Sequence, residues 1–255
     1  MNLTVIPLTS EKKDGKFSFF DELKRILKKN KFSVKEGDVL VISSKFLSNS
    51  QGRILDIEKS KVCQKASKIA KKFDSNAKFM EIVYRESDNI LGGVAGFVMS
   101  TTNGILAPNA GIDKSNSKGT KVVLYPEEPY KFAEDIKRKI FLELNLHVGV
   151  IIVDSRLMPA RIGTTGVAIA CAGIEPTKDL RGEKDLDGNP LKVTFQATAD
   201  NLASIANHKM GEADELLPIA IVRESGAKLT NRKISSDETA IPYDQCVYVR
   251  GLKKS

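Results

Sequence analysis

Several patterns are missing from this 255-residue chain, and each absence excludes a class of protein. No apolar run approaches the roughly 20 residues that a membrane-spanning helix needs. No basic stretch precedes an apolar one at the N-terminus, so we expect no secretory signal. The cysteines, Cys63, Cys171 and Cys246, lie far apart and form no CxxC pair. This spacing favours a cytoplasmic protein with reduced, mostly buried thiols over a disulfide framework or a zinc site.

Common catalytic and nucleotide-binding motifs are also missing. Only two histidines occur, His147 and His208, and neither has a cysteine or histidine neighbour at ligand spacing. A histidine-based metal site and a Ser-His-Asp triad are therefore not expected. The chain has no Walker A motif and no GxGxxG fingerprint, so any nucleotide site differs from the P-loop and dinucleotide-binding kinds.

The net charge of +8 raises the question of nucleic-acid binding. Much of this charge is lysine scattered over predicted helix faces, as at residues 24–35 and 59–72. No RNP-like motif, zinc-finger spacing or helix-turn-helix accompanies it, so we expect no specific binding to nucleic acid. A basic surface would instead help to attract anionic substrates.

The most informative stretch of the chain is residues 147–174. An unbroken apolar run, Val148 to Val153, predicts a buried strand, although periodicity alone does not distinguish it from a buried helix. The run delivers one carboxylate, Asp154, to its end, and a second run of small residues, 167–174, returns to the interior. Asp154 could bind a metal ion or position a proton there, or it could merely cap the next turn.

The remaining pattern predicts a mixed α+β fold in one unit, residues 1–255, with no linker that would separate independent domains. We expect strands at residues 3–7, 39–43, 148–153, 167–174 and 218–222. We expect helices at residues 18–27, 57–72, 80–87, 130–144 and 197–209. Hairpins are expected at residues 92–104 and around a turn at 187–190, with a return strand at 191–196. The hydroxyl-rich residues 43–54 read as a loop that could contact phosphate, although an ordinary loop explains them as well.

Three acidic residues, Asp113, Asp154 and Glu212, stand at the ends of predicted elements. Asp113 lies beside Ser115 and Asn116, whose oxygens suit hard cations, although a turn held by Asx hydrogen bonds explains the same pattern. Together the three carboxylates offer what a divalent-cation site for a phosphorylated substrate requires. The sequence thus favours chemistry of the Mg²⁺ or Mn²⁺ type.

Four motifs resemble the archaeal coenzyme F420-0:γ-glutamyl ligases: NAGIDKSN (109–116), VIIVDS (150–155), GTTGVAIACAGI (163–174) and MGEADELLP (210–218). The resemblance implies a ligase that joins L-glutamate to the lactyl-phospho tail of F420-0. It also implies GTP as co-substrate, an acyl-phosphate intermediate, two Mg²⁺ or Mn²⁺ sites and a potassium ion as a further candidate. The implied architecture is a homodimer of an unusual mixed fold, with two interleaved subdomains and both mixed and antiparallel sheets.

The same resemblance implies roles for individual residues. Asp113 and Asp154 would hold one metal ion, and Ser155 and Glu212 would hold the second. Asp154 and Arg161 would be the catalytic residues, with Arg161 contacting a substrate phosphate or carboxylate. The residues expected at the nucleotide are Ser44, Lys45, Asn116, Met210, Gly211, Glu212, Ala213 and Asp214.

The chain departs from the family pattern at several positions. Asn49 stands where a lysine is expected near the nucleotide phosphates, residues 156–162 lack one arginine and one glycine, and the loop after Pro7 lacks the apolar G-L-P pattern. These departures predict a divergent member. Two alternatives stay open: a ligase of the same fold for another phosphorylated acid or amino acid, and a non-catalytic protein that binds a nucleotide or nucleic acid.

Overall fold

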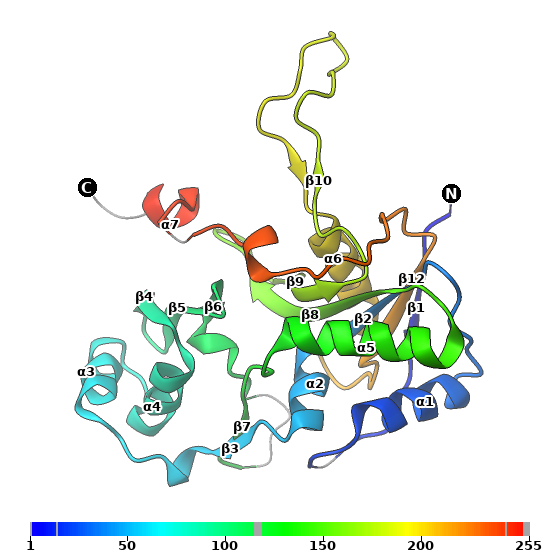
Figure 1. Ribbon diagram of the computed structural model, residues 1–255. Coiled ribbons are helices and arrows are strands. Elements are labelled where there is room, and N and C mark those ends of the chain that lie inside the picture. The colour runs from blue at the N-terminus through cyan, green and yellow to red at the C-terminus, as the bar shows by residue number, and fades with distance from the viewer. Residues whose placement is uncertain (1, 14, 115–118, 243, 252–255) are drawn as a thin grey trace.

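The computed structural model describes residues 2–13, 15–114, 119–242 and 244–251 (Figure 1). The strands are β1 (Thr4–Leu8), β2 (Val39–Ser43), β3 (Ile54–Asp56), β4 (Asn89–Val94), β5 (Phe97–Thr102), β6 (Ile105–Pro108), β7 (Lys121–Val123), β8 (Gly149–Leu157), β9 (Thr164–Ala172), β10 (Lys178–Asp179), β11 (Phe195–Gln196) and β12 (Ile219–Arg223). The α-helices are α1 (Phe19–Lys29), α2 (Ser44–Gln51), α3 (Gln64–Lys72), α4 (Ala77–Glu86), α5 (Pro129–Leu144), α6 (Thr198–Met210) and α7 (Val247–Gly251). Short 3-10 helices lie at Ile57–Lys59, Asn109–Gly111 and Ser236–Glu238.

A five-stranded sheet in the order β1-β12-β2-β8-β9 forms the centre of the molecule. Its two central strands, β2 and β8, are parallel, and all other neighbours in the sheet are antiparallel. Both central strands are apolar throughout their middle because both faces of the sheet are covered. The mixed α+β class expected from the sequence is confirmed.

Alternate residues of β2 separate the two layers of the core. Leu40 and Ile42 face the layer of α1 and α5, whereas Val39 and Val41 face the layer of α6. This alternation follows from the two-residue period of a strand. Helix α6 comes close to β9, because a Cβ at Gly166 would lie only 2.5 Å from Cβ of Asn207.

The long connection between β2 and β8 contains a smaller lobe, residues 54–125. Its core is formed by apolar residues of α3, α4, β5 and β7, among them Phe79, Met80 and Val98. The lobe holds the three-stranded sheet β4-β5-β6, and β3 pairs with β7 beneath it (Figure 1). Because β2 and β8 run parallel, the chain leaves the central sheet at the carboxyl end of β2 and must return to the opposite end of the sheet before β8 begins.

A long arm, residues 178–196, projects from the central sheet between β9 and α6 (Figure 1). Its base is the short antiparallel pair of β10 and β11. Several large apolar side chains on the arm are exposed: Leu186, Val193 and Phe195. Within the part of the chain that the structure describes, no helix is long and apolar enough to cross a membrane.

The prediction of a loop at residues 43–54 is wrong, because Ser44–Gln51 form helix α2 between the end of β2 and the start of β3. The Ser43 hydroxyl caps the helix by accepting from the Phe46 amide, and Gly52 ends it with a left-handed φ of 76°. Phe46 and Leu47 are buried and anchor the helix to the core. Tertiary packing therefore overrides the low helix propensity of the serines.

Three other sequence predictions need smaller corrections. The helix expected at residues 57–72 begins only at Gln64, where the Cys63 sulfur caps it and Glu81 accepts from the Cys63 amide. The return strand of the arm is confined to β11 and does not span residues 191–196. Strand β8 continues past Asp154 as far as Leu157, so the alternative that Asp154 merely caps the next turn is wrong.

Candidate active site

One edge of the central sheet brings together the termini of several strands. The last residue of β2, Ser43, lies opposite Val153 of the parallel strand β8, so helix α2 begins beside Asp154. The Ser43 amide donates to the Pro218 carbonyl just before β12, and the Ser10 amide after β1 donates to the Leu216 carbonyl. Segments that are distant in sequence therefore meet at the carboxyl ends of β2 and β8, which is where ligands bind in many open sheets.

Asp154 has two side-chain partners at this edge. Its Oδ1 accepts a hydrogen bond of 2.6 Å from the Ser44 hydroxyl, and its Oδ2 lies 3.0 Å from Nε of Arg156. Arg156 follows two residues later on β8, so both side chains leave the same face of the strand. Only 5% of Arg156 is exposed, and its other nitrogens donate to the Tyr125 hydroxyl and the Leu106 carbonyl.

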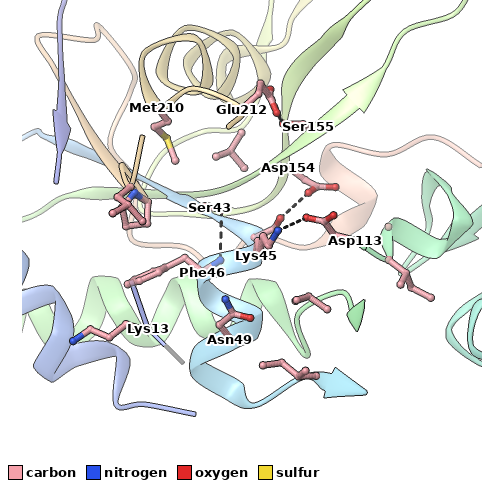
Figure 2. A pocket seen from close by; sticks show the side chains of 18 of the residues that line it. Lys13, Ser43, Lys45, Phe46, Asn49, Asp113, Asp154, Ser155, Met210 and Glu212 are labelled. Carbon is pink, nitrogen blue, oxygen red and sulfur yellow. Dashed lines mark hydrogen bonds and ion pairs between the residues drawn. The ribbon is translucent and has the colours of Figure 1, made fainter. Parts of the chain in front are cut away.

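Asp113 approaches from the smaller lobe. Its Oδ2 lies 2.7 Å from the Lys45 ammonium, and Lys45 follows Ser44 in the first turn of α2. Figure 2 shows the carboxylates of Asp113 and Asp154 side by side, with Lys45 and the start of α2 next to them. Consecutive residues of one helix thus contact two carboxylates that are 41 positions apart in the sequence.

Glu212 belongs to a second polar group on the other side of Asp154 (Figure 2). The Ser155 hydroxyl lies 2.8 Å from each oxygen of the Glu212 carboxylate. The amide of Asn207 and the hydroxyl of Thr164 also donate to Glu212. Successive residues of β8 point to opposite faces, which explains why Ser155 joins this group and Asp154 does not.

Both groups line one cavity of about 1560 Å³. The cavity also has a basic part, made of the lysines Lys12, Lys13, Lys16, Lys45, Lys59 and Lys121. The N-terminus of α2 faces it as well, and a helix N-terminus favours an anion. A site that combines carboxylates with lysines can hold metal ions and negatively charged substrate groups together.

Most of the site residues expected from the sequence meet in this cavity. Its lining includes Ser44, Lys45, Asp113, Asp154, Ser155, Met210, Gly211, Glu212, Ala213 and Asp214. Arg161 is exposed in the turn between β8 and β9, and it is not among the described residues that line the cavity. Asn116 lies outside the described residues.

Sequence reasoning missed four residues that shape the site: Arg156, Tyr125, Thr164 and Asn207. The alternation of β8 could have indicated Arg156, because it shares a face with Asp154. Nothing local indicated Tyr125, a buried residue beyond β7 whose hydroxyl reaches Arg156 from another part of the fold. Burial raises the pKa of the Tyr125 hydroxyl, so it stays protonated at neutral pH.

The donors fit divalent cations of the Mg²⁺ or Mn²⁺ type. Among the described residues, no three His, Cys, Asp or Glu side chains converge on one point. The site instead presents two oxygen pairs, Asp113 with Asp154 and Ser155 with Glu212. Mg²⁺ usually takes only one or two carboxylates from a protein and completes its shell with water and substrate phosphate.

An all-oxygen site beside lysines, at the carboxyl ends of central strands, is typical of an enzyme that acts on phosphorylated substrates. The family model "F420-0:Gamma-glutamyl ligase" matches residues 14–224. A relative from Methanocaldococcus jannaschii, named coenzyme F420:L-glutamate ligase, is 37% identical over 79% of this chain and 81% of its own length. Relatives of the same name from Methanopyrus kandleri and Archaeoglobus fulgidus are 31% and 36% identical, over 88% and 74% of this chain and 86% and 76% of their own lengths.

The chain is therefore an enzyme of the ligase class. It belongs to the F420-0:γ-glutamyl ligase family, as the resemblance of its motifs indicated.

Proposed function

We propose that the chain is a cytoplasmic ligase that uses GTP and divalent metal ions to join L-glutamate to the lactyl-phospho tail of coenzyme F420-0. Family membership supports the reaction, because the relatives are named for it. The observation that carries the proposal is the meeting of Asp113 and Asp154, from different parts of the chain, in a cavity that also contains lysines.

The proposed chemistry has two steps. A carboxylate oxygen of the lactyl group attacks the γ-phosphorus of GTP, and GDP leaves with the electrons of the broken P–O bond. The deprotonated amine of glutamate then attacks the acyl carbon of the resulting acyl phosphate, and inorganic phosphate leaves. The net result is one amide bond, one GDP, one phosphate and one released proton.

The residues of the cavity would bind and orient the reactants. Asp113 and Asp154 would hold one Mg²⁺ or Mn²⁺, and Ser155 and Glu212 would hold the other. When bound, the ions would neutralise phosphate charge and polarise the transferred phosphoryl group. The ammonium of Lys45 and the N-terminus of α2 would contact phosphate oxygens on the same side.

A second candidate is a ligase of the same fold that uses another phosphorylated acid or another amino acid. Asn49 favours it: this residue lines the cavity, and its buried Oδ1 accepts no hydrogen bond from the described residues. Such an oxygen can accept a hydrogen bond from a ligand, whereas a lysine at this position would provide a positive charge.

The reaction can be tested with purified protein, F420-0, L-glutamate, GTP and Mn²⁺, followed by mass spectrometry. We expect a product heavier by one glutamyl residue, with stoichiometric release of GDP, and no product from D154N. Replacing glutamate by other amino acids, and F420-0 by other phosphorylated acids, tests the second candidate. If GTP stays intact with every acceptor, the proposed GTP-dependent function is wrong.

The protein is also proposed to act as a homodimer. The arm at residues 178–196 supports this, because it projects from the molecule with Leu186, Val193 and Phe195 exposed. Exposed apolar side chains on a projecting element are a common feature of subunit interfaces. Sedimentation analysis of the L186S/V193S variant should show a shift towards monomer, with a matched K184S/K192S variant as control. Equal mass for the double variants and the wild type would exclude the arm as the interface.

A further inference from the structure

Tyr125 links Asp154 to the segment that carries Asp113. Its hydroxyl accepts a hydrogen bond of 2.7 Å from a terminal nitrogen of Arg156, whose Nε lies 3.0 Å from Asp154. Both Tyr125 and Arg156 are buried, with 3% and 5% of their surface exposed. Asp154 thus accepts a hydrogen bond from Ser44 and forms an ion pair with a buried guanidinium, whose Nε has no well-aligned hydrogen bond among the described residues.

The ring of Tyr125 also fixes the segment that carries Asp113. A Cβ added at Gly111, two residues before Asp113, would lie 2.5 Å from Cδ2 of Tyr125. The backbone of Asp113 exchanges two hydrogen bonds of 2.9 Å with Val123, two residues before Tyr125. The position of Asp113 is therefore coupled to Tyr125 both by ring packing and by strand pairing.

We infer that Tyr125 and Arg156 form a strut that sets the spacing between Asp113 and Asp154. They are positioning residues, because each acts through a carboxylate and neither needs to touch the metal ion. The inference rests on the metal site of the proposed function. It adds that the smaller lobe, through Tyr125, determines how well β8 can bind a cation.

A fixed support for the two carboxylates should strengthen cation binding. The carboxylates of Asp113 and Asp154 carry the same charge and repel one another, and the ion pairs with Lys45 and Arg156 offset this repulsion. Holding them in advance lowers the cost of ordering the site on binding. Outer partners of metal ligands commonly change metal affinity by about 10- to 100-fold when they are replaced.

The test is a titration with Mn²⁺, followed by electron paramagnetic resonance, on the full-length protein without substrate. Y125F removes only the phenolic hydroxyl and alters no charge, and we expect it to weaken Mn²⁺ binding by about tenfold. R156K keeps the positive charge but loses the fork that reaches Asp154 and Tyr125 together, so it should weaken binding to a similar degree. The double variant Y125F/R156K should lose no more Mn²⁺ affinity than the more strongly affected of the two single variants, because the two residues act as one unit.

A matched control is available at the opposite end of the same sheet. Arg223 forms a comparable ion pair of 2.7 Å with the buried Asp38, which precedes β2. R223K should lower the melting temperature and leave Mn²⁺ affinity unchanged.

The outcomes separate the strut from the function on which it rests. Loss of Mn²⁺ binding in D154N, together with wild-type affinity in Y125F and R156K, would overturn the strut alone. Additive losses in the double variant would also overturn it. Wild-type Mn²⁺ binding in D154N would overturn the proposed metal site itself.

Discussion

Replacing Asp154 or Asp113 by asparagine should abolish metal-dependent activity in both cases but affect the stability of the metal-free protein very differently. Arg156, the partner of Asp154, is 6% exposed at its side chain, and Asp154 itself is 20% exposed. D154N would leave this buried guanidinium without a counter-ion. Asp113 is 37% exposed and its partner Lys45 is 25% exposed, so water can solvate either group after D113N.

The expected magnitudes follow from these exposures. Removing one partner of a buried ion pair costs about 3–5 kcal/mol, and the lower value applies here because Tyr125 and the Leu106 carbonyl still accept from Arg156. D154N should therefore lose about 3 kcal/mol of unfolding free energy, which lowers Tm by roughly 6–12 °C for a chain of this size. An exposed pair contributes about 0–1 kcal/mol, so D113N should change Tm by no more than roughly 4 °C.

Urea denaturation of both variants in EDTA, followed by circular dichroism, measures this difference directly. Comparable denaturation slopes would show that the native and unfolded states are otherwise unchanged. Equal losses for D154N and D113N would refute the reasoning, because they would mean that burial of Arg156 does not determine the cost. A gain in stability for D154N would refute it more strongly. It would mean that Asp154 destabilises the metal-free protein in spite of its ion pair with Arg156.

Three further predictions concern the packing and titration of the scaffold. G166A should lower the unfolding free energy by about 1–3 kcal/mol in thermal denaturation, because the new methyl group would meet Asn207 of α6. Burial raises the pKa of Asp200 in the native state above its value in the unfolded state. The unfolded state therefore releases the proton at lower pH, and stability falls as the pH rises from the unfolded-state pKa to the native-state pKa. D200N keeps an acceptor for the Ala168 amide and should remove this decline in melting curves recorded from pH 4 to 7. Burial raises the pKa of Cys171 to about 12, so iodoacetamide at pH 8 should leave this thiol unmodified in the native protein, as mass spectrometry would show.

The sequence predicted the central sheet well because its strands have an unambiguous pattern. Runs such as 39–43 and 148–153 are too apolar to lie anywhere except between two covered faces. Helix α2 could not be predicted in the same way. Its serines favour loops, and only the burial of Phe46 and Leu47 against distant residues makes the helix stable.

The candidate site was predictable only in part. Asp113, Asp154 and Glu212 could be singled out because carboxylates beside buried runs are unusual. Strand alternation places Arg156 on the same face as Asp154, but the sequence does not show that Arg156 is buried and so does not mark it as a structural partner. The contact between Tyr125 and Arg156 depends on how the smaller lobe closes onto β8, which no local pattern encodes.

The order of strands in the central sheet constrains how the chain can be made. β1 is an edge strand whose partner in the sheet is β12, and Leu8 pairs with Ile219. During synthesis, the backbone groups of β1 therefore stay unpaired in this sheet until β12, the last of its strands in sequence order, has been made. Such a long-range closure is slow, and it leaves an unpaired strand open to association with other nascent chains. A chaperone that shields β1 during synthesis would relieve this weakness, and a circular permutation that places β1 next to β12 in the sequence would remove it.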